Sequence, residues 1–473
     1  MRLLIQALKK FLPLVFVLSC ASVLVAQVQP LFLTPDQTSS IDELAKQVLT
    51  RSGTPSASVA VVMGGTLVYA QAYGDARLDP RTAARPEMRY SIGSISKQFT
   101  AAAILLLAEE GKLSLDDKVA KFVPGLTRAN EVTIRQLLSH TSGYQDYWPQ
   151  DYVFSLMLKE TNPTAILDMW ARKPLDFDPG TKWQYSNTNY VIAGLIVEKV
   201  SGKTLFQFLQ QRVFKPLGME TVTDIDQAKL PAADPEGYFR YALGPLRPSP
   251  KEGKNWLFAA GELAMTAADL QKWNISVIKE TLLKPASYHA LETEVLLNNG
   301  AGTNYALGLS VRNPGGRREL SHTGEVSGYT ASSVILPENG IAVVVLTNQM
   351  AVGTASQISQ SIVAQLLKTQ QTVDQKADNI VTKILIDMAT GKIDRSLFTD
   401  NANAFFTDEA LKDYQATIAP LGDLQDVRPL GASGRGGMMA RGYSARFAKK
   451  GLRISVFEMP DGKIEQYLIT GSE

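Results

Sequence analysis

Cysteine is almost absent from this chain, which has a single one, Cys20, among 473 residues. No disulfide can therefore form within the chain, and the fold must be stabilised by a hydrophobic core. The hydrophobic content of 45% and the charged content of 20% are typical of globular proteins. Because the chain is too long for one ordinary domain, we expect a large domain and a smaller one.

Histidine and surplus positive charge are scarce as well. Three histidines and one cysteine leave no metal-ligand spacing, so we expect neither a metal nor another cofactor. The formal net charge is +2, and 45 positive and 46 negative residues remain once Arg2, Lys9 and Lys10 are set aside. This balance predicts no nucleic-acid partner. The absence of Gly-x-Ser-x-Gly argues against an α/β-hydrolase nucleophile.

The N-terminus has the pattern of a targeting segment. Three positive residues precede the apolar run from Phe11 to Ala26, which is the order found in a signal peptide. We expect cleavage after Ala26 and export to the periplasm or the extracellular space. Cys20 follows a weak lipoprotein box, so a lipidated Cys20 and an uncleaved membrane anchor stay as alternatives. No second apolar stretch is long enough to span a bilayer, so membrane contact is expected only through this segment.

The most informative segment is Ser94-Ile95-Ser96-Lys97, which directly precedes the apolar run from Phe99 to Ala108. A serine three residues before a lysine, at the start of an amphipathic helix, places both side chains on one face about one turn apart. Such a pair can act as nucleophile and base. The field of the helix N-terminus favours an alkoxide and disfavours a protonated lysine. The segment therefore predicts a serine acyl-transfer enzyme.

Two further motifs, Tyr185-Ser186-Asn187 and His322-Thr323-Gly324, lie downstream. Together with Ser94-x-x-Lys97 they resemble the serine β-lactamase and penicillin-binding superfamily. The resemblance is to the branch of class C β-lactamases, D-amino-acid peptidases and related esterases, in which Tyr-x-Asn takes the middle place. It covers residues 41–370 and includes three shorter segments, which are Leu137–Gly143, Lys215–Met219 and Thr266–Leu270.

This resemblance implies a role for each motif. The implied catalytic set is Ser94, Lys97, Tyr185 and Asn187, and the implied substrate-binding or oxyanion set is His322, Thr323, Gly324 and Glu325. Ser94 would form an acyl-enzyme that water hydrolyses, with either Lys97 or Tyr185 as general base. Asn187 would orient Lys97 and the acyl side chain of the substrate. The N–H groups of Ser94 and Glu325 would form the oxyanion hole. His140 is expected to hydrogen-bond within its loop rather than to react.

His322 stands where the family often has a lysine that pairs with the carboxylate of penicillins and peptidoglycan stems. A neutral imidazole supplies only a directional hydrogen bond, and the carboxylate of Glu325 would repel an anion. We therefore expect small esters, amides or neutral D-amino-acid derivatives to be better substrates than penicillins. Activity on anionic substrates should rise as His322 is protonated.

Two other functions stay open. One is a true β-lactamase or DD-carboxypeptidase acting on peptidoglycan-derived substrates. The other is a catalytically silent penicillin-recognising sensor or envelope scaffold. All four catalytic residue types are present, which favours an enzyme, and the sequence identifies no protein partner.

The resemblance implies an α/β fold of the α+β type, with an antiparallel sheet, flanking helices and an inserted helical lobe. The predicted organisation is a signal peptide at 1–26, a linker at 27–40, a serine hydrolase domain at 41–370, a linker at 371–376 and an α+β domain at 377–473. The last domain has two helical patterns followed by four strand patterns, and it loosely resembles cone-shaped NTF2-like folds. We expect it to be accessory and without catalytic groups, with a flexible turn around Arg435.

Local patterns predict several elements of the hydrolase domain. Gly64-Gly65 predicts a hairpin, and a capping box at Ser40 predicts a helix to about Leu49. The other expected elements are a nucleophile helix at 94–110, a helix at 189–200, strands at 319–322, 329–336 and 341–347, and a terminal helix at 355–367.

Overall fold

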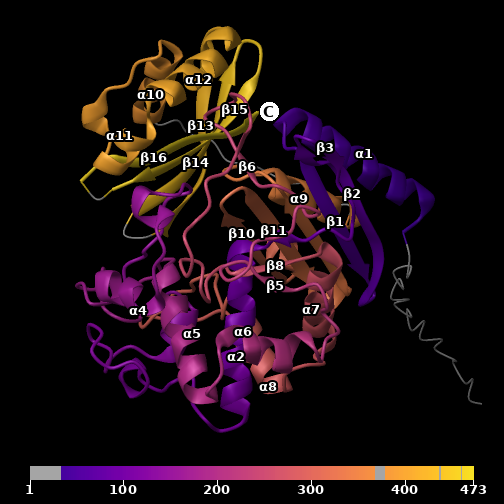
Figure 1. Cartoon of the computed structure of the whole chain (residues 1–473), viewed down its shortest axis with the longest axis vertical. Coiled ribbons are helices and arrows are strands. Elements are labelled where there is room, and N and C mark those ends of the chain that lie inside the picture. Colours follow the sequence, from indigo (N-terminus) through magenta and orange to yellow (C-terminus); the bar gives the residue numbers. More distant parts are fainter. Residues whose placement is uncertain (1–32, 368–378, 436–437, 460, 473) are drawn as a thin grey trace, which may run out of the picture.

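The structure, a computed structural model, describes residues 33–367, 379–435, 438–459 and 461–472 (Figure 1). The predicted targeting segment and the linker at 371–376 lie outside these residues. Residues 33–367 form a large unit, and residues 379–472 form a smaller one at the top of the view. Among the described helices, none has the length and apolar character needed to cross a bilayer.

A seven-stranded antiparallel sheet forms one half of the large unit, in the order β3-β2-β1-β12-β11-β10-β9. Its strands are β1 (Ser56–Met63), β2 (Thr66–Leu78), β3 (Arg81–Ala83), β9 (Ser310–Arg312), β10 (Glu319–Val326), β11 (Tyr329–Leu336) and β12 (Ile341–Thr347). Every residue of β1, β11 and β12 is buried, because elements cover both faces of the sheet. The predicted hairpin is confirmed, since Gly64 and Gly65 both adopt positive φ and join β1 to β2.

Helices α1 (Pro35–Ser52) and α9 (Thr354–Leu367) pack on one face of this sheet. The predicted start of the first helix at Ser40 is wrong. Thr34 is the N-cap: its hydroxyl accepts from the N–H of Gln37, and the side chain of Gln37 accepts from the N–H of Thr34. This capping box lies next to Pro35, whose fixed φ suits the first helical position.

The other face of the sheet packs on a larger core that it shares with the helical lobe. The helices of this part are α2 (Ser96–Glu109), α3 (Ile134–Leu138), α4 (Pro163–Ile166), α5 (Asn187–Ser201), α6 (Leu205–Leu209), α7 (Ala267–Lys279) and α8 (Pro285–Glu292). Two small sheets join the halves: β4 (Tyr90–Ser91), β8 (Leu263–Met265) and β5 (Thr223–Asp224) in one, and β6 (Tyr238–Phe239) and β7 (Arg247–Pro248) in the other.

Helix α2 differs from its prediction in two ways. Ser94 lies on a 3₁₀ turn, Gly93–Ile95, and the α-helix begins only at Ser96. All residues from Ser96 to Leu107 are buried, so the helix is surrounded by protein rather than amphipathic. A helix enclosed on all sides gives its N-terminal turn a fixed position, and this turn carries Ser94.

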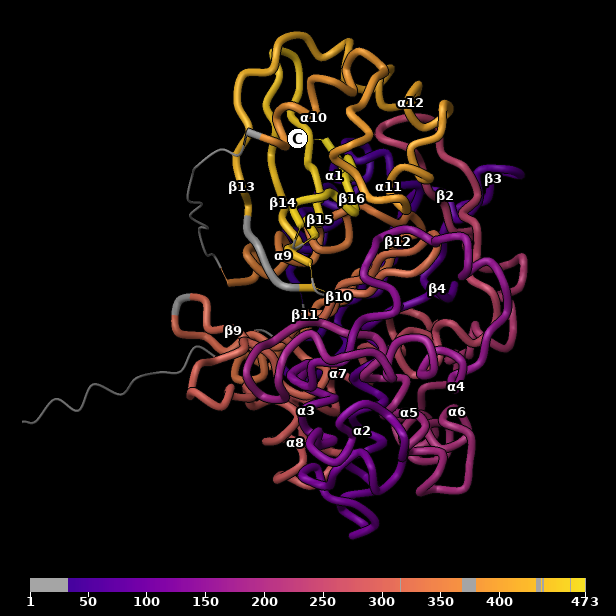
Figure 2. Tube along the Cα trace, turned by 90° about the vertical axis from the view of Figure 1, so that its left-hand side faces the viewer, coloured from indigo at the N-terminus to yellow at the C-terminus, as the bar shows by residue number. Residues whose placement is uncertain are grey.

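The smaller unit has a four-stranded antiparallel sheet with helices on one side (Figures 1 and 2). Its elements are α10 (Asn379–Ala389), α11 (Asp400–Phe405), α12 (Asp408–Ile418), β13 (Leu424–Arg435), β14 (Met438–Phe447), β15 (Gly451–Glu458) and β16 (Ile464–Ser472). Leu385, Tyr414 and Leu452 are at the centre of its own hydrophobic core. The α+β architecture agrees with the predicted fold class, and the likeness to NTF2-like folds stays a prediction.

The two units pack directly against each other. Tyr152 of the helical lobe stacks on Phe405, with ring centroids 4.8 Å apart. Arg247 of β7 donates to Asp413 of α12 at 2.8 Å. The smaller unit is therefore positioned by contacts with the large unit, and one of its strands reaches the region of Ser94.

Candidate active site

The turn that carries Ser94 lies against strand β10, and two glycines allow this close approach. A Cβ on Gly324 would overlap the carbonyl oxygen of Ile92, and a Cβ on Gly93 would lie 2.6 Å from the backbone nitrogen of Glu325. Gly93 also has a φ of 49°, which favours glycine. The third motif therefore runs beside the nucleophile turn, and Gly324 acts through its lack of a side chain.

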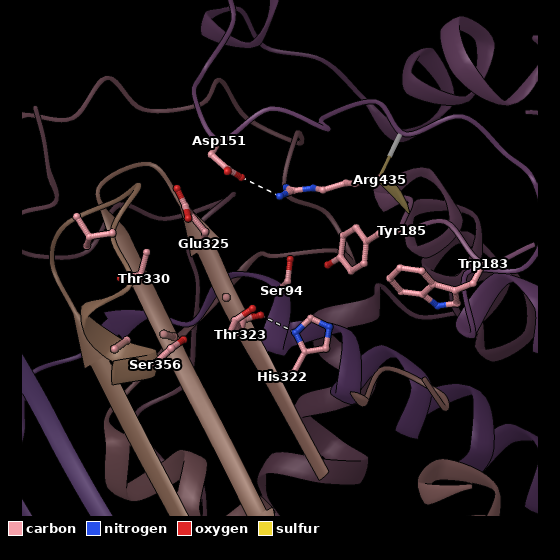
Figure 3. A pocket seen from close by; sticks show the side chains of 14 residues that line it. Ser94, Asp151, Trp183, Tyr185, His322, Thr323, Glu325, Thr330, Ser356 and Arg435 are labelled. Atoms are coloured by element: carbon pink, nitrogen blue, oxygen red, sulfur yellow. Dashed lines mark hydrogen bonds and ion pairs between the residues drawn. The ribbon is translucent and has the colours of Figure 1, made fainter. Parts of the chain in front are cut away.

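A cavity of about 350 Å³ opens beside Ser94 (Figure 3). Its described lining includes Ser94, Asp151, Trp183, Tyr185, His322, Thr323, Gly324, Glu325, Thr330, Ser356 and Arg435. Six of the eight predicted site residues are in this lining. The other two, Lys97 and Asn187, lie behind Ser94 in the protein interior. The structure thus brings all three sequence motifs to one place.

Lys97 is fully buried and its Nζ lies 2.9 Å from the Oγ of Ser94. Nζ also donates to the Oδ1 of Asn187 and to the carbonyl oxygen of Ala260, both at 2.8 Å. These two oxygens only accept, so a neutral amine would donate both of its protons to them and direct its lone pair at Ser94. Burial lowers the pKa of Lys97 well below its ordinary value, although nearby Asp146 opposes this effect. The geometry and the lowered pKa both favour Lys97 as a proton acceptor.

Tyr185 is the other candidate base. Its ring lies beside Ser94 in Figure 3, and the Nζ of Lys97 lies 4.9 Å from its ring centroid. Burial raises the pKa of Tyr185 above its ordinary value of 10, although the hydrogen bond with Ser94 acts in the opposite direction. A phenol that keeps its proton can donate it or relay it, but it cannot accept the proton of Ser94. The structure therefore favours Lys97 over Tyr185 as the base.

Asn187 begins helix α5, and its amide is held in one orientation. Its Nδ2 donates to Asp146 and to the carbonyl oxygen of Trp148, both at 3.1 Å. The Oδ1 is thereby directed at Lys97. Asp146 also accepts from the backbone N–H of Asn187 at 2.9 Å. No sequence motif marks Asp146, because this buried carboxylate reaches Asn187 and Lys97 only when distant segments come together on folding.

The model of the family described as Beta-lactamase matches residues 41–365. The chain belongs to the β-lactamase family. This match covers the seven-stranded sheet, the helical lobe and all eight predicted site residues, and it confirms the superfamily and the fold class that the motifs predicted. The family is one of serine hydrolases.

Several relatives support this assignment. Penicillin-binding protein 4* of Bacillus subtilis (strain 168) is 29% identical over 310 residues, which are 62% of this chain and 68% of that protein. Protein flp of Staphylococcus aureus (strain MW2) is 30% identical over 328 residues, which are 67% of this chain and 64% of that protein. The chain thus spans less than two thirds of the length of Protein flp.

Solved structures of the same fold are also similar. A D-stereospecific amidohydrolase from Streptomyces sp. is 27% identical with a TM-score of 0.60, over 71% of this chain and 100% of that chain. The octameric penicillin-binding protein homologue from Pyrococcus abyssi is 21% identical with a TM-score of 0.61, over 92% of this chain and 99% of that chain. At 92% coverage the second likeness includes much of the smaller unit, and it concerns the fold alone.

Within this β-lactamase family fold, His140 is hydrogen-bonded as expected, but its side-chain partner lies in the second motif rather than in its own loop. Its Nδ1 accepts from the backbone N–H of Ser186 at 3.1 Å. Its ring packs on the ring of Tyr185, with centroids 4.2 Å apart. His140 therefore fixes the second motif on the side of Tyr185 that faces the protein interior.

His322 is a neutral imidazole, as predicted, but its ring is already hydrogen-bonded within the protein. Its Nδ1 lies 2.5 Å from the carbonyl oxygen of Thr323, which can only accept, so Nδ1 carries the proton. Its Nε2 then accepts from the hydroxyl of Tyr305 at 2.8 Å. Both ring nitrogens are occupied by these contacts, so neither offers a hydrogen bond to a substrate. Burial lowers the pKa of His322 to about 3, which agrees with the neutral imidazole expected at pH 7 and places its protonation well below neutral pH.

We predict that the imidazole of His322 does not titrate between about pH 5 and pH 8. At a pKa of about 3, about 1% of His322 would be protonated at pH 5. The measurement is the ring-proton NMR signal of His322, assigned by its loss in His322→Gln. A midpoint between pH 5 and pH 8 would contradict the hydrogen-bonded, buried imidazole.

Glu325 follows the third motif, and its carboxyl lines the cavity. Its Oε1 accepts from the backbone N–H of Ala351 at 2.9 Å. Burial raises the pKa of Glu325 well above its ordinary value, which favours the uncharged acid. The expected repulsion of anionic substrates by this residue is therefore not supported.

The position of Arg435 differs from the prediction that the smaller unit is only accessory and that this residue lies in a flexible turn. It ends strand β13, and its backbone pairs in parallel with that of Tyr185. Its Nη1 donates to Asp151 at 2.8 Å, a contact drawn in Figure 3. The smaller unit thus supplies part of the cavity wall, and Arg435 belongs to a strand rather than to a flexible turn. Sequence alone missed it because a lone arginine beside glycines acquires its partners only on folding.

Proposed function

We propose that this protein is an exported serine hydrolase that forms an acyl-enzyme on Ser94 and acts on small esters, amides or D-amino-acid peptides. The observation that carries the proposal is the contact of Ser94 with a buried lysine whose remaining partners are acceptors only. The similarity to an enzyme described as a D-stereospecific amidohydrolase supports D-amino-acid substrates. The apolar N-terminal segment behind three positive residues supports export.

The proposed reaction follows from the contacts. Ser94 attacks the acyl carbon while Lys97 accepts its proton, and the backbone N–H groups of Ser94 and Glu325 stabilise the oxyanion. Tyr185 donates its proton to the leaving group, which departs as an alcohol or amine, and regains a proton from Lys97, so that both residues return to their starting states. Water then attacks the acyl-enzyme by the reverse proton path and regenerates Ser94.

The alternative of a true β-lactamase or DD-carboxypeptidase is supported by the similarity to proteins named as penicillin-binding. Because His322 is neutral, it supplies no positive charge at the third motif to bind the penicillin carboxylate, which argues against this alternative. A silent sensor or envelope scaffold is less well supported, because Lys97 contacts both Ser94 and Asn187.

The test is the covalent adduct itself. After brief incubation with a p-nitrophenyl ester, a D-amino-acid anilide or benzylpenicillin, intact-mass spectrometry should show one acyl group, and peptide mapping should place it on Ser94. We expect fast turnover of the first two compounds and slow turnover of the third. Ser356→Ala, which changes another serine of the cavity wall, is the matched control and should keep the adduct. Ester hydrolysis that persists in Ser94→Ala at the wild-type rate would overturn the proposal.

A further inference from the structure

We propose that Arg435 is a specificity-determining residue that binds a carboxylate on the acyl portion of the substrate. The inference rests on the proposed function and names the substrate class: acyl or N-acyl-D-amino-acid derivatives whose acyl group ends in a carboxylate. The smaller unit would then select the substrate, while the large unit carries out the reaction.

The first argument is the charge of the cavity. Among the described residues that line it, Arg435 is the only one with a permanent positive charge. His322 is neutral, and Lys97 is buried behind Ser94. Among the described lining residues, Arg435 is therefore the one that can form an ion pair with an anionic group in this cavity.

The second argument is the position of Arg435. Figure 3 shows Arg435 and His322 on opposite sides of Ser94. Arg435 also lines a second, much smaller cavity of about 30 Å³ together with Asn187 and Trp148. Under the proposed function Asn187 orients the acyl side chain, so we place the acyl group on the side of Ser94 where Asn187 and Arg435 lie. Arg435 therefore does not replace the family's third-motif lysine, which serves the opposite side.

The third argument is how the guanidinium is held. Its Cζ lies 5.8 Å from the ring centroid of Tyr185 and 5.1 Å from that of Phe457. Asp151 pairs with its Nη1 and is itself fixed by Gln466, which donates to Asp151 at 2.7 Å. The two aromatic rings and Asp151 thus hold the planar guanidinium in place. A planar guanidinium can pair with both oxygens of a carboxylate.

The fourth argument is unused binding capacity. The Nε of Arg435 is buried and lacks a hydrogen-bond partner in the part of the chain that the structure describes. The side chain as a whole is still 28% exposed, and it lines the cavity. The exposed part of the side chain is therefore the part that is accessible to a carboxylate in the cavity.

The experiment uses three p-nitroanilides of D-alanine that differ only at the amino group: free amine, N-acetyl and N-succinyl. In each case Ser94 forms an ester with the D-alanine carbonyl, p-nitroaniline leaves with a proton, and water releases the acid. We expect the wild type to prefer N-succinyl over N-acetyl by about 10- to 100-fold in kcat/KM, mostly through KM. The free amine, which is cationic, should be the poorest substrate.

Arg435→Gln should bring the ratio of N-succinyl to N-acetyl close to one. Arg435→Lys keeps the positive charge but lacks the planar guanidinium, so it should give an intermediate ratio. This variant tests the proposal if Arg435→Gln does not fold. The matched control is Arg446→Gln on the neighbouring strand β14, where the side chain is exposed and outside the cavity. It should leave both rates unchanged.

Two failures can be told apart. In the first, all three anilides are hydrolysed in a Ser94-dependent way, but N-succinyl is not preferred, or the free amine is preferred because its cation pairs with Asp151. The proposed role of Arg435 is then wrong, and the proposed function holds. If no adduct forms on Ser94 with any ester or anilide, the proposed function fails, and this inference fails with it.

Discussion

Ser94→Ala is expected to lower kcat/KM for ester and amide substrates by a factor on the order of a million. The Oγ of Ser94 is the atom that contacts Lys97, and alanine offers no atom that can form the acyl bond. The fold should survive, because the 3₁₀ turn is held by backbone contacts with β10 and the lost hydroxyl faces the cavity. The measurement is steady-state kinetics on a p-nitrophenyl ester, with the thermal unfolding midpoint as the control for folding. A variant that keeps a tenth of the wild-type rate would show that another group is the nucleophile.

The second large effect concerns Lys97 and Tyr185 as one proton-handling unit. Lys97→Met, which keeps most of the side-chain volume, and Tyr185→Phe should each slow acylation by several orders of magnitude. Both residues contact Ser94, so removing either one interrupts the same proton path. The double variant should be little slower than the worse single variant, because parts of one unit are not additive.

Single-turnover kinetics of acylation measure this coupling, and fully additive losses would refute it. Tyr144→Phe is the matched control for the tyrosine. The hydroxyl of Tyr144 is buried in the same lobe and has no hydrogen-bond partner among the described residues. Its removal should change the acylation rate by less than about threefold.

The sequence predicted some elements to the residue and others poorly, for physical reasons. Strands β11 and β12 match their predicted bounds because both are buried runs delimited by Gly328 and by the turn ending at Gly340. The predicted start of α1 failed because the capping box at Ser40 and the one at Thr34 follow the same rule. The folded chain uses the one beside proline.

The candidate site shows the same division. Ser94, Tyr185 and Asn187 could be found because their chemistry requires fixed residue types at short spacings. Asp146 and Arg435 could not, since each acts through a contact between segments far apart in the chain. The state of His322 also depended on such a contact, because its Nε2 is occupied by the hydroxyl of Tyr305.

The contact between strand β13 and the second motif has an evolutionary consequence. The predicted catalytic residues come from one unit of the chain, whereas part of the cavity wall comes from another. Natural or engineered chimeras that exchange residues 379–472 would retain the bond-breaking chemistry and acquire a new repertoire of acyl groups. Diversification of such an enzyme would then proceed by recombination of whole units, without any substitution among the residues that react.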